Sequence, residues 1–162
     1  TVFGYWVEDP ERFGIMEIDN AGNVLSVEEK PEHPKSNYCI TGLYFYPAGV
    51  SKRAKAVKKS ERGEYEITTL NEMYLQDGLL KAKLLGRGYS WLDTGTMDSL
   101  LEAGSFVEMV EKRQGIMICA PEEIAYRNGW IDRGALEGLI KLCGKSSYGK
   151  HLKNIVDDKI IY

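Results

Sequence analysis

The sequence predicts a mixed α/β fold whose helices are concentrated toward the C-terminus. Short β-prone runs separated by Gly- and Pro-containing turns fill much of the first half, whereas apolar residues recur at helical spacing in the second half. The 162 residues are 43% hydrophobic and 28% charged, which is typical of a folded domain with a sizeable core. No repeat, low-complexity tract or linker interrupts them.

Strands are predicted from short apolar runs that are bounded by turn residues. The runs at 14–18 and 24–30 flank the Gly-containing segment DNAGN, which indicates a β-hairpin. Segment 31–37 carries two prolines and is predicted to be a loop, because proline cannot donate to a central ladder. The predicted strands comprise residues 1–7, 14–18, 24–30, 38–47, 79–86 and 116–120.

Helices are predicted where apolar residues recur every three or four positions. The clearest one begins at Asp98 or Ser99 as its N-cap and ends at Gly115, and another has Pro121 in its first turn. The predicted helices comprise residues 48–59, 66–78, 98–115, 121–129, 132–144 and 146–158. The side chains expected to face inward are Val50, Ala54, Val57, Ile67, Leu70, Tyr74, Leu101, Phe106, Val107, Val110, Tyr148, Leu152, Ile155 and Val156.

Composition excludes several classes of protein. The net charge of −3 comes without a dominant basic face, which argues against a nucleic-acid partner. No apolar run is long enough to span a bilayer and no signal peptide is visible, so no membrane partner is expected. Three dispersed cysteines argue against a disulfide framework and favour a reducing cytoplasm. Because the chain starts at Thr1 within a predicted strand, we expect it to be a fragment.

A first group of candidate residues lies at the end of the predicted strand 24–30. Adjacent strand residues point to opposite faces, so Glu28 and Glu29 are not expected to serve the same site. The functional interpretation assigns a sugar hydroxyl to Glu29 and a phosphate to Lys30. Composition alone favours the structural interpretation, in which these residues are simply a solvated strand end before a proline-containing loop.

Two further candidates precede predicted helices. Arg62 offers planar donors that suit phosphate, but the sequence in isolation favours a solvated arginine in a helix-capping loop. Asp93 follows a buried-looking run and precedes Thr94, Gly95 and Thr96. It is either a Mg²⁺ ligand at a strand end, with Trp91 as a flat wall beside the ligand, or a turn residue next to a core tryptophan.

A last candidate group lies in the segment 119–130. Glu123 and Arg127 are four residues apart and can pair with each other on a helix, or Arg127 can hold a second anion together with Arg87. His33 and His151 have polar neighbours in the sequence and are predicted to lie on the surface. The spacings of a Ser-His-Asp triad or a zinc site are missing.

Several segments of the chain form a recognisable series. They are DPERFG, EEKPEHPKSNY, TGLYFYP, ERGEYEIT, GRGYSWLDTGTMDSLLEA and EKRQG followed by CAPEEIAYRNGWI. Taken together, in this order and at this spacing, they resemble the glucose-1-phosphate thymidylyltransferase family. The match extends to about Asp132, and the tail beyond it is generic.

The resemblance implies a Rossmann-like nucleotidyltransferase fold, here a mixed sheet followed by a C-terminal helical region. It also implies that glucose 1-phosphate and dTTP react, with Mg²⁺, to give dTDP-glucose and pyrophosphate for dTDP-rhamnose synthesis in a cytoplasmic homotetramer. The family's Gly-rich nucleotide loop and first metal-binding Asp have no counterpart in this sequence. We therefore expect residues 1–115 to be the sugar-phosphate part of the core, 116–162 to be a helical regulatory region, and the chain alone to be inactive.

Position by position, the resemblance also implies roles for individual residues. It makes Lys30, Arg62 and Asp93 catalytic, with Asp93 as a Mg²⁺ ligand. The substrate-binding residues would be Gly14, Glu29, Lys30, Ile40, Tyr44, Arg62 and Trp91. The residues of a regulatory nucleotide site would be Gly86, Arg87, Cys119, Glu123, Ile124 and Arg127.

Two alternatives remain open on the sequence. A sugar-1-phosphate nucleotidyltransferase that uses UTP, CTP or GTP would share these residues, because the N-terminal half of the family's enzymes, which this sequence lacks, recognises the nucleobase. A non-catalytic module that binds sugar phosphate or a partner subunit would lack the Gly-rich loop. A carboxylate hydrolase is weaker, since Lys30 and Arg62 have little purpose without phosphate. The upstream coding sequence would separate enzyme from module.

Overall fold

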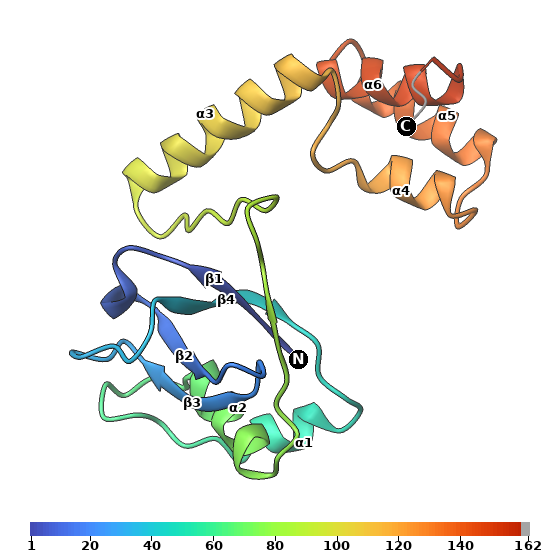
Figure 1. Cartoon of the computed structure of the whole chain (residues 1–162). Helices are drawn as coiled ribbons and strands as arrows, with labels where there is room; N and C mark the ends of the chain where they lie inside the picture. The colour runs from blue at the N-terminus through green and yellow to red at the C-terminus, as the bar shows by residue number, and fades with distance from the viewer. Residues whose placement is uncertain (160–162) are drawn as a thin grey trace. The chain divides into compact units, whose positions relative to one another are not determined.

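The computed structural model describes residues 1–159, and within them five strands form one sheet (Figure 1). The order across the sheet is β3-β2-β4-β1-β5, and every pairing is antiparallel except that of β1 with β5. The predicted hairpin is confirmed, with Gly14 opposite Glu29. The strands are β1 Val2–Trp6, β2 Gly14–Ile18, β3 Val24–Glu29, β4 Tyr38–Tyr44 and β5 Ala82–Leu84.

The helices follow the predicted order with three corrections. The N-cap of the clearest helix is Thr96, and the prediction of Asp98 or Ser99 is wrong because both lie within its first turn. The first predicted helix stops at Ala54, well short of residue 59. The strand predicted at 116–120 is wrong, because these residues form an irregular connection between helices. The described elements around that segment are all helical, so a strand there would have no partner for its backbone groups. The helices are η1 Pro10–Arg12, α1 Val50–Ala54, α2 Ile67–Gln76, α3 Met97–Gln114, α4 Pro121–Arg127, α5 Arg133–Cys143 and α6 Ser147–Val156.

The chain divides into two compact units, Thr1–Trp91 and Leu92–Tyr162. The first unit contains the sheet, α1 and α2, and the second contains α3 to α6. Helix α3 therefore belongs with the helical region, whereas the sequence analysis placed the division after residue 115. The roles predicted for the two parts stay predictions. Among residues 1–159, none of the helices has the length and apolar character that a membrane crossing requires.

Each face of the sheet carries its own apolar cluster, because neighbouring strand residues point to opposite faces. Met16 and Ile40 belong to the α2-side core, which α2 completes with Leu70 and Tyr74. Ile15 and Cys39, one residue earlier in each strand, belong to the opposite-face cluster. The α2-side core comprises Val2, Met16, Val24, Val27, Ile40, Leu70, Tyr74 and Leu80, and the opposite-face cluster comprises Val7, Ile15 and Cys39 with Tyr5, Phe13 and Trp91 packed against them.

In the second unit, the apolar faces of α5 and α6 pack together around Leu136, Leu152 and Val156, which confirms the predicted stripe of α6. Predictions for isolated helix faces were less accurate. Ile67 and Leu101 were expected to face inward, but their exposed fractions are 41% and 72%. Helical spacing identifies a shared face but does not determine how much of that face a neighbour covers.

Candidate functional site

Glu29 ends β3 with its side chain on the α2 side of the sheet. Thr68, in the first turn of α2, donates its hydroxyl to Glu29 Oε2 at 2.5 Å. A Cβ atom on Gly14 would lie 3.0 Å from Thr68 Oγ1 and 3.1 Å from Glu29 Oε2. Glycine at position 14 therefore leaves room for this carboxylate. Glu28 pairs with Lys35 at 2.5 Å. It also lines the same cavity as Glu29, so the expectation that the two carboxylates serve different sites is not confirmed.

Arg62 lies among acidic side chains beside this carboxylate. Its guanidinium nitrogens are 3.9 Å from Glu29, 3.6 Å from Glu66 and 3.2 Å from Glu64. Arg62, Glu29 and Thr68 line a cavity of about 390 Å³ in the first unit. Because Arg62 is only partly buried, these contacts are weak enough for an incoming anion to replace them. The structure thus brings together Gly14, Glu29 and Arg62.

Lys30 adopts a left-handed backbone conformation, with φ of 44°. Its amide donates to the carbonyl of Phe13 at 3.0 Å, which holds the chain in this turn directly after β3. The residue is exposed, and it does not line the cavity of Glu29 and Arg62. A lysine in this conformation costs stability, and residues with such a cost are often found at functional sites. The position of Lys30 directly after Glu29 is therefore consistent with a role for its side chain.

We expect Lys30→Asn to raise the unfolding free energy of this chain by about 1 kcal/mol, because asparagine adopts the left-handed region at a lower cost than lysine does. Chemical denaturation followed by circular dichroism measures the change. Lys30→Met is the matched control, since it removes the same charge but keeps the strain and should leave stability unchanged. Equal stability of both variants would contradict a cost at this turn.

The aliphatic and aromatic residues predicted for the pocket fall into different clusters. Ile40 is buried in the α2-side core, and Tyr44 packs against that core. Burial raises the pKa of Tyr44, and the charge of Glu29 raises it further. Tyr44 does not line the cavity of Glu29 and Arg62. Trp91 instead packs against Tyr5 and Phe13 in the opposite-face cluster, with ring centroids 6.0 and 5.2 Å away.

Asp93 lies in the second unit, in the irregular segment before α3. It does not cap that helix, because Thr96 accepts from the Ser99 amide and forms a reciprocal capping box with it. A Cβ atom on Gly95 would lie 3.2 Å from the Asp93 carboxylate, so glycine keeps that side open. Asp93 suits one ligand position on a hard cation. Residues 1–159 contain no group of three candidate metal-binding side chains, so further oxygen ligands would have to come from phosphate or elsewhere.

Glu123 forms a buried polar cluster with Arg127 of its own helix and with His151 of α6. Arg127 Nε donates to one carboxylate oxygen at 2.7 Å, and His151 Nε2 donates to the other at 2.6 Å. Burial by itself raises the pKa of Glu123, but the hydrogen bonds from His151 and Arg127 outweigh it, so the pKa lies below 4.5. The ion pair predicted between Glu123 and Arg127 is confirmed.

The surface position predicted for His151 is wrong, because its side chain is only 6% exposed. Its polar sequence neighbours concealed its position beside Leu152 on the buried face of α6. Spacing from Tyr148 was the available signal: Tyr148 bonds to Glu122, and three residues later His151 bonds to Glu123. His33 is exposed, as predicted.

The remaining residues predicted for a regulatory site belong to different units. Gly86 and Arg87 line a cavity of about 360 Å³ in the first unit, together with Tyr5, Trp6 and Tyr38. Cys119 and Ile124 are exposed residues of the second unit. The side chain of Arg127, in the same unit, is 39% exposed. A common site for the two groups stays a prediction.

Comparison with known proteins gives a consistent result. The family model for nucleotidyl transferases matches residues 1–110. A glucose-1-phosphate thymidylyltransferase from Xanthomonas campestris is 56% identical over 94% of this chain and 52% of its own length. Those from Neisseria gonorrhoeae and Mycobacterium tuberculosis are 51% and 49% identical over 96% and 97% of this chain, and 54% of each relative is covered.

A solved structure agrees with these relatives. It is a Bacillus anthracis protein described as a glucose-1-phosphate thymidylyltransferase, crystallised in complex with sucrose. It is 42% identical, has a TM-score of 0.57, and aligns with 65% of this chain and 42% of its own. The chain spans about half the length of the curated relatives it matches. With the family model extending over its whole sheet and into α3, the chain belongs to the nucleotidyl transferase family.

Proposed function

We propose that this chain is the sugar-phosphate-binding, C-terminal part of a glucose-1-phosphate thymidylyltransferase. The complete enzyme would transfer dTMP from dTTP to glucose 1-phosphate and release pyrophosphate, supplying dTDP-glucose for dTDP-rhamnose synthesis. The observation that carries the proposal is the meeting of Glu29 and Arg62 in one cavity, with Gly14 making room for the carboxylate. The names of the curated relatives support the choice of substrates.

Each group has a chemical role suited to phosphoryl transfer. Glu29 would accept a hydrogen bond from a sugar hydroxyl, while Arg62 and Lys30 would hold phosphate oxygens. An oxygen of the sugar phosphate would attack the α-phosphorus of dTTP in line, as the bond from that phosphorus to pyrophosphate breaks. Mg²⁺, when bound, would neutralise the phosphate charge, with Asp93 supplying a carboxylate ligand. Positioning and charge neutralisation, rather than covalent chemistry, would provide the rate enhancement.

The proposal extends to the setting of the enzyme. We place it in the cytoplasm as a homotetramer, as the family resemblance implies. We also propose that Arg87 and the Glu123–Arg127 pair contribute to a regulatory nucleotide site. Support comes from the ordered guanidinium of Arg127, which the buried carboxylate of Glu123 orients.

We expect the 162-residue chain to bind glucose 1-phosphate without releasing pyrophosphate from added dTTP. Isothermal titration calorimetry measures the binding, and a coupled pyrophosphate assay measures turnover. Arg62→Met should weaken binding by roughly tenfold or more, because a hydrogen bond to a charged group is worth about 1.5 to 3 kcal/mol.

Arg133→Met is the matched control, because Arg133 is an exposed arginine of the second unit that pairs with Glu137. It should leave the affinity for glucose 1-phosphate unchanged. Failure of the unchanged chain to bind this ligand, or equal binding by the two variants, would contradict the proposed site. Pyrophosphate release by the unchanged chain would contradict the predicted lack of turnover.

A further inference from the structure

The guanidinium of Arg62 is held by different carboxylates at its two terminal nitrogens. Nη1 lies 3.6 Å from Oε1 of Glu66 and 3.9 Å from Oε1 of Glu29, and both of these residues line the cavity of about 390 Å³. Nη2 lies 3.2 Å from Oε2 of Glu64, which does not line that cavity. One nitrogen is therefore directed to the cavity wall, while the other pairs with a carboxylate beyond it.

The two carboxylates nearest to Arg62 differ in burial. The side chain of Glu66 is 12% exposed, whereas that of Glu64 is 62% exposed. Water and salt screen an exposed ion pair, so that it contributes little, and they screen a partly buried pair much less. Of the contacts that an incoming anion can replace, the one with Glu64 is therefore lost most easily, and the one with Glu66 is best kept.

A turn at residues 60–64 fixes the carboxylate of Glu66. Ser60 donates its hydroxyl, at 3.0 Å, to the same Oε1 that faces Arg62. The amide of Ser60 donates to the carbonyl of Glu64 and the amide of Gly63 donates to the carbonyl of Ser60, each at 2.8 Å. Gly63 has a φ of 80°, a conformation that glycine adopts without strain. The turn thus places a hydroxyl and a guanidinium on one carboxylate oxygen.

Glu66 occupies the N-cap position of α2 without capping the helix. Its side chain accepts no hydrogen bond from the amides at the start of α2. Serine, threonine, aspartate and asparagine are the residues that cap well, and such a cap stabilises a helix. A glutamate that leaves these amides uncapped and contacts Ser60 and Arg62 instead indicates that its side chain serves the cavity rather than the helix.

We propose that Glu66 is a positioning residue for the sugar-phosphate site. It holds Nη1 of Arg62 at the cavity wall, so that Nη2 is available to the phosphate once Glu64 is displaced. A guanidinium that is already ordered loses less conformational entropy when the ligand binds, and this raises the affinity. The inference rests on the proposed function, because it concerns how that site takes up its sugar phosphate.

Positioning and simple electrostatics predict opposite signs for the loss of this carboxylate. A negative charge close to a phosphate site repels the phosphate, so removing a carboxylate that has no other role should strengthen binding. If Glu66 instead orders Arg62, its removal should weaken binding, although one repulsive charge is lost. The direction of the change therefore separates the two roles.

The test measures binding of glucose 1-phosphate to the 162-residue chain by isothermal titration calorimetry. Glu66→Gln keeps the shape and an oxygen for Ser60 but removes the charge that faces Arg62. It should weaken binding by roughly three- to tenfold, as expected when one long side chain must be ordered on binding. Glu64→Gln is the matched control, because it neutralises the other carboxylate on the same guanidinium, and it should leave the affinity unchanged or raise it.

A double-mutant cycle shows whether Glu66 acts through Arg62. In the Arg62→Met background, Glu66→Gln should cause no further loss of affinity, because the group that it orders is already absent. A general structural role, or a direct contact of Glu66 with the sugar, would lower the affinity in both backgrounds. If Arg62→Met binds too weakly to be measured, the opposite results of the two single glutamine variants still decide. If Glu66→Gln does not fold, Ser60→Ala takes its place, since it removes only the hydroxyl that orients Glu66 and should weaken binding in the same direction.

Each outcome has one meaning. Weaker binding by Glu66→Gln, without weaker binding by Glu64→Gln, supports the inference. Equal or tighter binding by Glu66→Gln, or a loss of the same size in the Arg62→Met background, overturns the inference and leaves the proposed function intact. No binding of glucose 1-phosphate by the unchanged chain overturns the proposed function and the inference with it.

Discussion

Asp93→Asn is expected to lower the turnover of the proposed complete enzyme by on the order of 10²-fold or more, the loss typical of one preorganised electrostatic contact. Asparagine keeps the shape and one neutral oxygen but removes the charge that a hard cation requires. The fold should tolerate the change, because Thr96 and not Asp93 caps α3. Steady-state turnover at saturating Mg²⁺ measures the effect, and thermal unfolding verifies the fold.

Asp98→Asn is the matched control for this experiment. Asp98 is an exposed acidic residue in the first turn of α3, five residues after Asp93 in the sequence. Its replacement should not reduce turnover. Near-normal turnover of Asp93→Asn would show that Asp93 is only part of the turn before α3. A similar loss in both variants would point to the electrostatics of the helix start rather than to a bound cation.

Glu123→Ala is expected to destabilise the second unit by on the order of 3 kcal/mol, the cost of breaking a buried charged pair from one side. The substitution leaves His151 Nε2, in a side chain that is only 6% exposed, without its acceptor and removes the oxygen that Arg127 Nε contacts. Urea denaturation of the whole chain, followed by circular dichroism, measures the difference in unfolding free energy between Glu123→Ala and the unchanged chain.

The destabilisation caused by Glu123→Ala should decrease as the pH falls into the acid range. Because the folded state lowers the pKa of Glu123, its ionised carboxylate stabilises the fold fully above the ordinary value of 4.5. That stabilisation is lost as the pH falls below 4.5 and through the lowered pKa. The stability difference between the two proteins should therefore be constant near neutral pH and shrink in acid.

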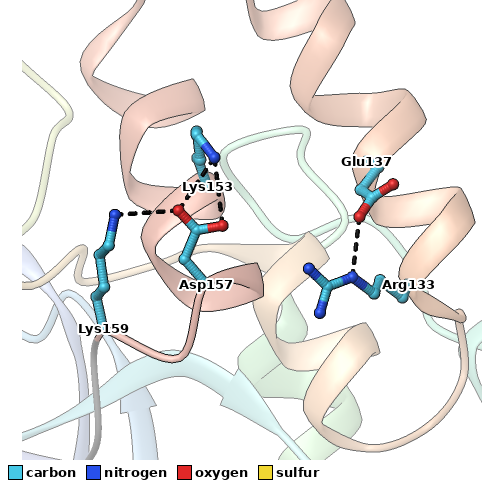
Figure 2. A network of polar contacts seen from close by, with 5 residues as sticks. All are labelled: Arg133, Glu137, Lys153, Asp157 and Lys159. Atoms are coloured by element: carbon cyan, nitrogen blue, oxygen red, sulfur yellow. Dashed lines mark hydrogen bonds and ion pairs between the residues drawn. The ribbon is translucent and has the colours of Figure 1, made fainter.

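Glu137→Ala provides the control for charge removal alone. Glu137 accepts from Arg133 at 2.9 Å on the surface of α5, and both side chains are at least half exposed (Figure 2). Exposed pairs of this kind contribute about 0.3 to 0.5 kcal/mol, so the variant should be nearly as stable as the unchanged chain. In the same view, two exposed lysines, Lys153 and Lys159, pair with the partly buried Asp157. An equally small loss in Glu123→Ala would show that the buried cluster contributes no more than a surface pair.

Local patterns were sufficient for the elements whose causes are local. The hairpin of β2 and β3 was predicted because a Gly-containing turn and two flanking β-prone runs lie within seventeen consecutive residues, 14–30. Gly115 ends α3 in the left-handed conformation, as its position after a helical pattern predicted. The apolar run 116–120 was assigned wrongly, because a strand requires a partner and no local pattern reports whether one is available.

The sequence by itself determined the family resemblance, the positions of the five strands along the chain, and the types of residue that suit a sugar phosphate. Only the tertiary structure decided which of those residues meet. Thr68 bonds to Glu29 across 39 positions, His151 to Glu123 across 28, and Asn71 to Tyr46 across 25. Such contacts depend on how α2 and α6 pack against their neighbours, and packing is set by the sum of many apolar contacts rather than by a local pattern. A buried histidine and a buried amide therefore look, in the sequence, the same as exposed ones.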